Sequence, residues 1–362
     1  QVKALGATIK AKITGNFVKE NQYQGSYIDE LAKNLEIDTE DKTDEEIGTF
    51  AVDKLYDEII ADCHEMGIKF DLVVFESELR KQAPQVLDEL KHAGVLKKKD
   101  GALWLAPNDE FLKDRETVIQ KSDGGYTYFT ADIVYHQQKF RSGADPIIDV
   151  FGSNHHGHIP RLQAAVAALG FDPGRLKVVL YQYVRVKRGN KVVKMSKRAG
   201  DFIAAREVLD EVGKDAFRFW LLRFAPQTHM DFDLELLKQQ SSKNPVYYVQ
   251  YAHARMANIL AKAGEDKGDL GLLIHPKETI LIKHLLIFPD LIIEVASNLQ
   301  VHQLTEYAIN LADLFHKFYE NCPVLQAGNE ELVGARLALV KASKITLANV
   351  LNLLGVSAPE RM

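Results

Sequence analysis

Apolar residues recur at three- and four-residue spacing through the last third of the chain, which is the spacing of amphipathic helices. Four segments carry the pattern, at residues 247–262, 277–299, 302–319 and 330–354. Asn321, Pro323 and Gly328 interrupt it between the last two, as turn-forming residues do. The pattern predicts a helical bundle that forms a separate domain.

The middle third has the pattern of an α/β fold. Apolar runs at residues 147–152 and 176–186 suit strands, and a helical pattern closed by Gly170 lies between them. Strand, helix and strand in this order predict a parallel βαβ unit, which binds ligands at the C-terminal ends of its strands. We therefore expect a ligand edge at the loop of residues 152–158.

Shorter elements precede this unit. We expect helices at residues 26–35, 45–66 and 84–93 and strands at residues 71–75, 102–106 and 126–129, the last leading into a helix that contains Asp132. Gly94 follows the third helix, where glycine commonly ends a helix. Residues 38–46 hold six acids and one lysine, which is typical of an exposed linker.

The composition is that of an ordinary soluble protein, with 46% hydrophobic and 26% charged residues. No stretch approaches the roughly 20 apolar residues that span a bilayer. Cys63 and Cys322 lie far apart, without CxxC spacing, and are the only cysteines. This usage argues against a disulfide framework or a thiolate zinc site and favours a reducing cytosol.

A net charge of −5 does not indicate a nucleic-acid-binding protein. Residues 173–200, however, contain nine Lys or Arg and no Asp or Glu. Such a segment is either a solvated basic hairpin or a contact for polyphosphate or RNA. Within it, Lys194 and Lys197 flank Ser196 in the sequence KMSKR. Two mobile ammonium groups and a hydroxyl on a loop can close around a pyrophosphate as negative charge builds up on it.

The sequence KMSKR resembles the second ATP signature of class I aminoacyl-tRNA synthetases. Downstream, DEVGKDAFRFW, DFDLELL and NPVYYVQYAHAR are similar to the arginyl member of the class. Upstream, SDGGYTYFTADIVYH (122–136) and DVFGSNHHGHIPRL (149–162) are similar to it as well, and so are residues 335–362. The resemblance covers the chain from about residue 121 onward and is thinner before that point.

The resemblance implies an α/β plus all-α fold: the second half of a class I Rossmann-type parallel sheet followed by an α-helical anticodon-binding bundle. The expected parts are a partial catalytic domain with an insertion (1–205), connecting helices that resemble a stem-contact region (206–240) and the anticodon-binding domain (241–362). The implied activity is arginine–tRNA ligation through an arginyl-adenylate. It would use ATP with Mg²⁺, L-arginine and the tRNA for arginine, in a cytoplasmic monomer with no membrane attachment.

The resemblance also implies roles for single residues. Tyr128 and Asp132, four apart and so on one helix face, would contact the arginine side chain together with His156. A carboxylate suits a guanidinium because it accepts two parallel hydrogen bonds from it. The ATP-binding candidates are Gly152, Asn154, His155, Val193, Lys194, Met195 and Lys197, and Lys194, Ser196 and Lys197 would stabilise the leaving pyrophosphate. The family more often has an aspartate at position 154, so the source of a ribose hydrogen bond stays open.

Two further sets of residues remain. Three histidines at positions 155–158 suggest a metal, but no cysteine or acidic cluster completes a site, and we predict none. By resemblance, the tRNA-binding candidates are Tyr248, Tyr251, Tyr319 and Met362, where aromatic rings would stack on anticodon bases. Aromatic residues at helical spacing are more often core residues, and residues 241–362 hold 11 basic against 12 acidic residues.

The first ATP signature of the class, His-x-Gly-His, is not found; the nearest string is HGHI at residues 156–159. We therefore expect that this chain alone cannot activate arginine, which an ATP–pyrophosphate exchange assay tests. Three other interpretations stay open: a non-catalytic tRNA-binding module, a cysteinyl or methionyl enzyme, and a nucleotidyltransferase that shares only the half-sheet and the lysine loop. Two separate cysteines argue against a cysteine-specific zinc site.

Overall fold

The computed structural model describes residues 1–16, 23–35, 37–106, 116–189, 191–193, 203–263 and 267–362. These residues form two units, each assembled from segments that are separate in the sequence. One unit contains Gln1–Lys69, Val184–Ala225 and Asp231–Met362, and the other contains Phe70–Tyr183 and Pro226–Met230. The smaller unit is therefore inserted into the larger one along the chain.

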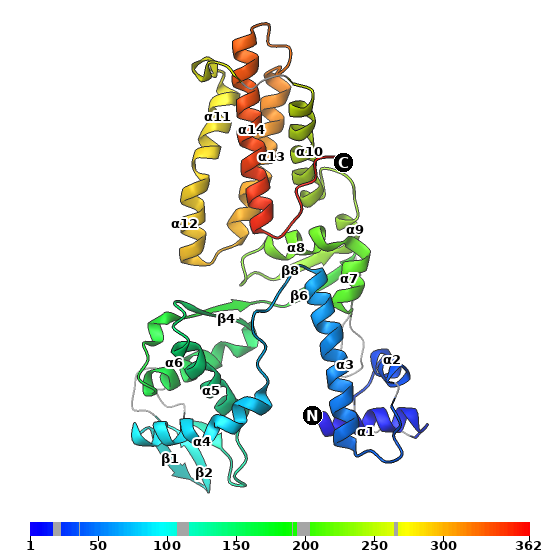
Figure 1. Ribbon diagram of the computed structural model, residues 1–362, viewed down its shortest axis with the longest axis vertical. Helices are drawn as coiled ribbons and strands as arrows, with labels where there is room; N and C mark the ends of the chain where they lie inside the picture. The colour runs from blue at the N-terminus through cyan, green and yellow to red at the C-terminus, as the bar shows by residue number, and fades with distance from the viewer. Residues whose placement is uncertain (17–22, 36, 107–115, 190, 194–202, 264–266) are drawn as a thin grey trace. The chain divides into compact units, whose positions relative to one another are not determined.

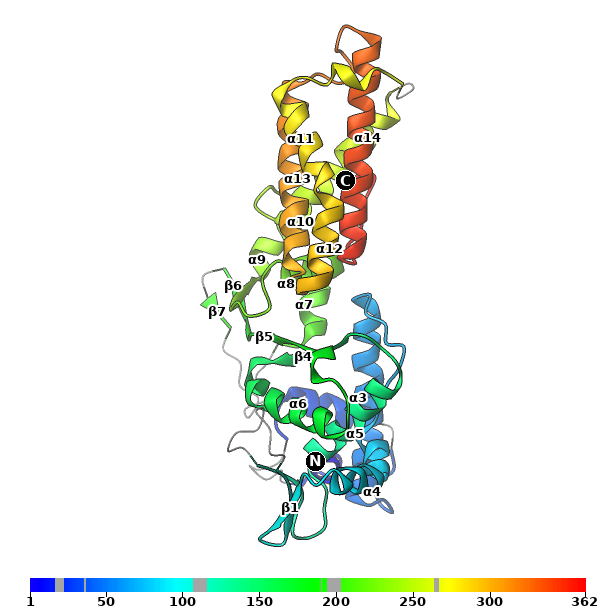
Figure 2. The same ribbon diagram turned by 90° about the vertical axis from the view of Figure 1, so that its left-hand side faces the viewer.

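A parallel pair of strands organises the smaller unit. β4 (Ile147–Gly152) and β5 (Leu176–Tyr181) pair from Ile147↔Leu176 to Gly152↔Tyr181. Helix α6 (Ile159–Ala168) connects them, as the predicted βαβ unit requires, and ends ahead of Gly170, which has φ +83°. Figure 2 shows β4 and β5 side by side with α6 next to them.

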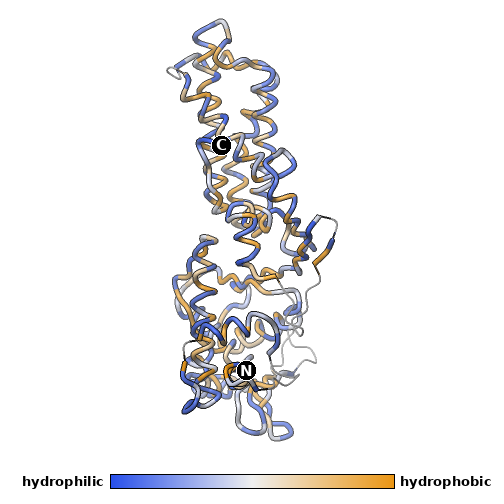
Figure 3. Tube along the Cα trace, turned by 90° about the vertical axis from the view of Figure 1, so that its right-hand side faces the viewer, coloured by the Kyte–Doolittle hydropathy of each residue, from blue (hydrophilic) through white to orange (hydrophobic). Residues whose placement is uncertain are grey.

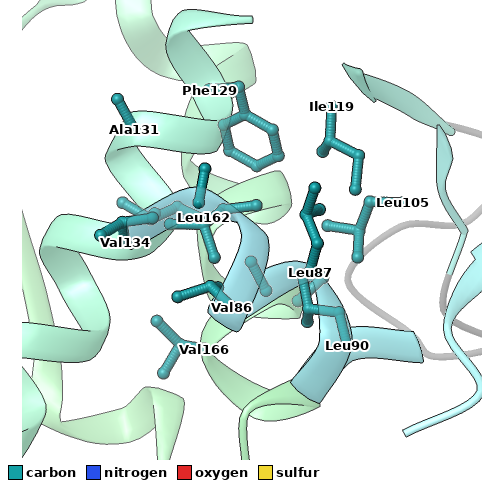
Figure 4. Packing of buried hydrophobic residues seen from close by; sticks show 14 of the residues in the cluster. Val86, Leu87, Leu90, Leu105, Ile119, Phe129, Ala131, Val134, Leu162 and Val166 are labelled. Carbon is teal, nitrogen blue, oxygen red and sulfur yellow. The ribbon is translucent and has the colours of Figure 1, made fainter. Parts of the chain in front are cut away.

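The core of this unit lies between the strands and helices α4 (Glu76–His92), α5 (Tyr128–Arg141) and α6. Its side chains include Val86, Leu87, Leu90, Phe129, Val134, Leu162 and Val166, which Figure 4 shows packed together. Leu105 and Ile119 reach the same core from an antiparallel sheet of β1 (Leu96–Lys99), β2 (Ala102–Leu105) and β3 (Thr117–Gln120). Burial of these apolar surfaces is what holds α5 against β4.

Three helices begin the larger unit: α1 (Val2–Ile13), α2 (Ser26–Asn34) and α3 (Asp44–Glu65). Thr43 and Glu46 form a capping box that starts α3. A Cβ atom on Gly48 would lie 2.1 Å from the carbonyl oxygen of Val2, so α1 and α3 approach each other through a glycine. The glycine is therefore required by packing rather than by backbone conformation.

A three-stranded sheet and short helices follow in the larger unit. The sheet has the order β7 (Lys191–Val192), β6 (Val184–Arg188), β8 (Met230–Asp233). The helices are α7 (Ala205–Val212), α8 (Lys214–Leu222) and α9 (Leu234–Leu237). Ion pairs link these elements, with Arg188 of β6 bonded to Glu211 of α7.

The C-terminal bundle contains α10 (Pro245–Ala261), α11 (Pro276–Leu286), α12 (Phe288–Asn298), α13 (His302–Asn321) and α14 (Glu330–Leu353). In Figure 1, α10, α11, α13 and α14 run alongside one another. Figure 3 shows hydrophobic and hydrophilic stretches alternating along them, which is the pattern that predicts a bundle from sequence. No helix of the described residues is long and apolar enough to cross a membrane.

Several predicted elements differ from the observed ones. Residues 72–75 form no strand, and Leu72 is 72% exposed, because within the described part of the chain no neighbouring strand pairs with them. The predicted strand 176–186 divides into β5 and β6 at Gln182, whose N–H donates to Pro226 instead of to a strand. The predicted helix 277–299 breaks at Ile287, because Pro289 lacks the N–H that a continuing helix needs.

Three helix starts also differ. Helix α4 begins at Glu76 and continues through Pro84, because apolar residues on both sides of the proline, such as Leu79 and Val86, pack into the core. Helix α5 begins at Tyr128, so the predicted strand 126–129 is reduced to one bridge between Tyr126 and Gln120. Helix α3 begins at Asp44, within the segment predicted to be a linker.

Candidate functional site

The turn that follows β4 lies at the C-terminal ends of the two parallel strands. It is the 3-10 turn η1 (Ser153–His158). A Cβ atom on Gly152 would lie 2.7 Å from Oδ1 of Asn154, so the glycine leaves room for this side chain. Tyr181, the last residue of β5, lies beside the same glycine. This is the edge of an α/β sheet at which ligands bind.

Two histidine rings of this turn pack against aromatic rings of the preceding elements. The His158 side chain is 12% exposed, and its ring packs edge-on against Phe129 of α5, with 5.1 Å between ring centroids. The His155 ring stacks on Phe151, with 5.5 Å between ring centroids. His155 and His158 also contact each other edge-on. The turn is therefore packed against aromatic side chains of α5 and β4.

A contact between a histidine and a carboxylate joins the turn to α5. Nε2 of His158 lies 3.1 Å from Oδ2 of Asp132, whose side chain remains 42% exposed. Tyr128, one helical turn before Asp132, is 68% exposed. A partly exposed carboxylate with one oxygen on a histidine can still accept a planar cation. No group of three His, Cys, Asp or Glu suited to a metal ion occurs among the described residues.

A second concave region lies in the helical bundle. A cavity of about 410 Å³ is lined by Ser242, Tyr247, Tyr248, Tyr251, Arg255, His316 and Glu320. The rings of Tyr247 and Tyr251 are nearly parallel, with 6.2 Å between their centroids. Nη2 of Arg255 donates to the Tyr251 hydroxyl at 2.7 Å. The guanidinium carbon lies 4.7 Å from the ring centroid of Tyr251 and 5.5 Å from that of Tyr319.

The protonation of His316 follows from its neighbours. Nδ1 of His316 lies 3.2 Å from Nη1 of Arg255, and since arginine can only donate, Nδ1 accepts and Nε2 carries the proton. Burial, reinforced by the charge of Arg255, lowers the pKa of His316, so the ring is neutral at pH 7. The described residues provide no hydrogen-bond partner for Nε2. The cavity thus combines stacked rings, one fixed cation and a neutral histidine.

Two family models match the chain, one over the part that contains the turn η1 and the other over the helical bundle. The model described as the catalytic domain of class I (R) tRNA synthetases matches residues 8–223. The model described as the DALR anticodon binding domain matches residues 249–362. The chain belongs to the arginyl-tRNA synthetase family. The predicted family and fold class are therefore confirmed: a class I catalytic domain with a helical anticodon-binding domain.

Individual arginyl-tRNA synthetases agree with this assignment. An arginine–tRNA ligase of Moorella thermoacetica is 43% identical over an alignment of 324 positions, which covers 86% of this chain and 57% of that protein. One of Thermotoga maritima is 40% identical over an alignment of 362 positions, which covers 95% of this chain and 66% of that protein. The chain thus spans about three-fifths of the length of the curated relatives it matches.

Solved structures show the same fold. A Campylobacter jejuni structure assigned to the arginyl-tRNA synthetases has 32% identity and a TM-score of 0.89, with 100% of this chain and 82% of that one covered. Thermus thermophilus arginyl-tRNA synthetase has a TM-score of 0.77 at 23% identity, covering 99% and 74%. A methionyl-tRNA synthetase of Mycobacterium tuberculosis is 10% identical with a TM-score of 0.66, covering 98% and 87%, so it shares the fold alone.

The structure brings several predicted residues of the synthetase chain together. Gly152, Asn154, His155 and His156 share the turn η1 and its preceding residue, and Asp132 is paired to the same turn. In the bundle, Tyr248 and Tyr251 line one cavity, and Tyr319 flanks its Arg255. Met362 is 54% exposed at the end of the chain. The roles of all these residues stay predictions.

The remaining predicted residues lie in or next to the KMSKR segment. Lys194, Met195, Ser196 and Lys197 lie outside the described residues. Val193 is described, and its N–H donates to the carbonyl of Val186 at 2.9 Å, directly after the β6–β7 hairpin. The predicted limits of the three parts, at residues 205 and 240, also stay predictions.

Three residues that lie at the turn η1 or at the cavity of the bundle were not predicted from the sequence. His158 pairs with Asp132 across 26 positions, and the only sequence signal for it was the third histidine of the 155–158 run. Arg255 and His316 lie 61 positions apart and meet because α10 packs on α13. Neither has a local pattern that distinguishes it from an ordinary helix residue.

Proposed function

We propose that this chain acts in ATP-dependent charging of tRNA with L-arginine, as the part of an arginine–tRNA ligase that binds arginine, the nucleotide and the anticodon. The observation that carries the proposal is the partly exposed Asp132 carboxylate, which His158 fixes at the C-terminal edge of the parallel strands. In an arginyl-tRNA synthetase chain, this is the group that a guanidinium needs.

The proposed reaction needs no protein nucleophile. A carboxylate oxygen of arginine attacks the α-phosphorus of ATP, the bond from this phosphorus to the bridging oxygen breaks, and pyrophosphate leaves with the electron pair. A terminal ribose hydroxyl of the tRNA then attacks the carbonyl carbon, and AMP leaves. Catalysis therefore consists of positioning and of stabilising charge on the leaving groups.

Arginine would bind along α5. Asp132 would accept two hydrogen bonds from the guanidinium, with Tyr128 at the exposed start of the helix and His156 on the adjoining turn. His158, whose Nε2 lies 3.1 Å from Oδ2 of Asp132, would hold the carboxylate in one orientation. A neutral ureido group of the same shape, as in citrulline, lacks the positive charge that this carboxylate favours.

ATP would enter as its Mg²⁺ complex and bind over the glycine at the end of β4. The open backbone at Gly152 and the side chains of Asn154 and His155 would face the ribose and adenine. Lys194, Ser196 and Lys197 would stabilise the leaving pyrophosphate, with Val193 and Met195 beside them. Of the nine basic residues of segment 173–200, Arg175, Arg185, Lys187 and Arg188 pair with carboxylates in the structure, so Lys194 and Lys197 would supply the positive potential that a polyphosphate requires.

The tRNA would bind through the bundle, where an anticodon base can stack on Tyr251 or Tyr319. Tyr248 and the terminal Met362 complete the proposed surface. Two cysteines that form no disulfide fit a reducing, cytoplasmic location, and we extend the proposal to a monomer with no membrane attachment.

Asp132→Asn tests the arginine site. Equilibrium dialysis with labelled arginine measures the dissociation constant, and competition with citrulline measures the preference for charge. We expect the variant to weaken arginine binding by about 1.5–3 kcal/mol, the contribution of a charge-assisted hydrogen bond, and to abolish the preference over citrulline. Asp88→Asn, on the exposed face of α4, is the matched control. Unchanged discrimination in Asp132→Asn would contradict the assignment.

A further inference from the structure

A buried cluster of charged side chains lies between α5 and β4. Nε2 of His136 lies 2.6 Å from Oδ2 of Asp149, and Nζ of Lys139 lies 2.7 Å from Oδ1 of the same carboxylate. The side chains of His136 and Asp149 are only 3% and 4% exposed. Asp149 occupies an inward-facing position of β4, between Ile147 and Phe151, where the strand pattern calls for an apolar residue.

The carboxylate of this cluster is ionised. Burial of Asp149 opposes ionisation, but the hydrogen bonds and charges of His136 and Lys139 outweigh burial and lower the pKa of this group. Lys139 also lies over the ring of Tyr135, with 4.3 Å from Nζ to the centroid. The cluster therefore holds one negative charge that is balanced from two sides.

The hydrogen-bond partners of His136 fix its protons. Nδ1 lies 2.7 Å from the carbonyl oxygen of Asp132, which can only accept, so Nδ1 carries a proton. Nε2 faces the ionised carboxylate of Asp149, which can also only accept, so Nε2 carries a proton too. A histidine that donates from both nitrogens is an imidazolium cation.

His136 thereby links the candidate site to the strand behind it. One nitrogen holds the backbone of Asp132, and the other holds Asp149, three residues before Gly152 on β4. The side chain of Asp132 is held from the other side by His158. Both the backbone and the carboxylate of Asp132 are thus fixed relative to the turn that follows β4.

We propose that His136 and Asp149 are positioning residues for arginine recognition: as a buried imidazolium–carboxylate pair they set the place of the Asp132 carboxylate relative to Gly152. The proposal rests on the arginine site proposed above. A misplaced carboxylate loses one of the two parallel hydrogen bonds to a guanidinium, whereas contacts that a nucleotide makes at Gly152 are left intact.

Two variants test the role in binding. His136→Gln/Asp149→Asn replaces the ion pair by neutral amides of similar size, and Lys139→Met removes only the third partner, whose side chain is 24% exposed. We expect arginine to bind the double variant about tenfold more weakly or worse, as small misplacements cost, with ATP affinity within twofold of the original. Lys139→Met should have a smaller effect on arginine in the same direction. Lys98→Met, on the exposed side of β1, is the control and should change neither.

The charge is tested separately by nuclear magnetic resonance on the chain labelled with ¹⁵N-histidine. Both ring nitrogens of His136 should give the signature of protonated nitrogens, because both face groups that can only accept. His136→Gln assigns the signal. In Asp149→Asn the signature should become that of a neutral ring. A neutral His136 in the original chain would overturn the ion pair.

The binding outcomes separate the two proposals. If Asp132→Asn abolishes arginine binding but the double variant binds arginine normally, the positioning role is wrong and the arginine site stands. If both arginine and ATP weaken equally in the double variant, the cluster is a general support of the fold, and the positioning role is again wrong. If Asp132→Asn leaves arginine binding unchanged, the proposed function fails and the positioning role fails with it, whatever the resonance of His136.

Discussion

A buried ion pair in the helical bundle gives the most quantitative prediction about its stability. Nε of Arg336 on α14 lies 2.6 Å from Oε1 of Glu278 on α11, and the two side chains are 11% and 1% exposed. The second oxygen of Glu278 accepts from the backbone of His275 at 2.9 Å, and Nη1 of Arg336 donates to the carbonyl of Pro323 at 2.8 Å. The pair therefore joins two helices and two connectors, and Glu278→Gln is the smallest change that breaks it.

The expected loss can be worked out in two ways. At an effective dielectric constant of about 20, two unit charges about 4 Å apart attract each other by about 4 kcal/mol. Removing one partner of a buried pair typically costs about 3–5 kcal/mol, because the other charge stays buried. Glutamine keeps one acceptor oxygen, so one of the two donors that Glu278 satisfies is left without a partner. We therefore expect the bundle to lose about 3–5 kcal/mol.

Native-state hydrogen exchange at amides in the middle of α14 measures the free energy of opening this domain. Glu306→Gln, on an exposed position of α13, is the control and should change it by less than about 0.5 kcal/mol. The double variant Glu278→Gln/Arg336→Met also removes the unpaired cation, so it should be more stable than Glu278→Gln alone. A loss below about 1 kcal/mol in Glu278→Gln, or strictly additive effects, would refute the reasoning.

Three further predictions concern the two proposed sites. Burial lowers the pKa of His316, so the folded chain favours the neutral ring; the stability that this gives is present above the unfolded pKa, about 6.5, and is lost as the pH falls below it. In urea denaturation, the free energy of unfolding should therefore fall less between pH 7 and pH 5 in His316→Gln than in the original chain. Tyr319→Ala should weaken binding of an arginine anticodon stem–loop by about 1–3 kcal/mol in a filter-binding assay, and an unchanged affinity would remove this ring from the surface. Gly152→Ala should displace Asn154 and weaken ATP binding in a calorimetric titration, whereas Gly157→Ala, with nothing within 4 Å of the added atom, should leave it unchanged.

Elements whose signal is local could be predicted from the sequence. The strand 147–152, the helix that ends ahead of Gly170 and three of the four helical segments of the bundle match the structure closely, because periodicity and terminal glycines act within a few residues. The fourth, 277–299, is divided by Pro289. The family, and with it the proposed function, followed from the resemblance of KMSKR and its flanks, not from these patterns.

Features that depend on partners distant in the sequence could not be predicted. The division of 176–186 into two strands depends on a hydrogen bond from Gln182 to Pro226, and α4 continues through Pro84 because its flanking residues are buried. The same applies to the site. Asp132 was predicted from resemblance, but its partner His158 becomes visible only when α5 and the turn after β4 pack together.

In the proposed function, the chain separates attraction of RNA from recognition of its bases. Residues 241–362 hold nearly equal numbers of basic and acidic residues, so this domain adds little of the phosphate attraction that binds any RNA sequence. Its cavity instead presents the aromatic rings of Tyr251 and Tyr319, with the guanidinium of Arg255 held beside both. Base contacts discriminate between sequences, whereas phosphate contacts do not. A near-neutral domain with an aromatic cavity is therefore better suited to discriminating between anticodons than a basic domain. RNA that lacks the matching bases would bind to it with little favourable free energy.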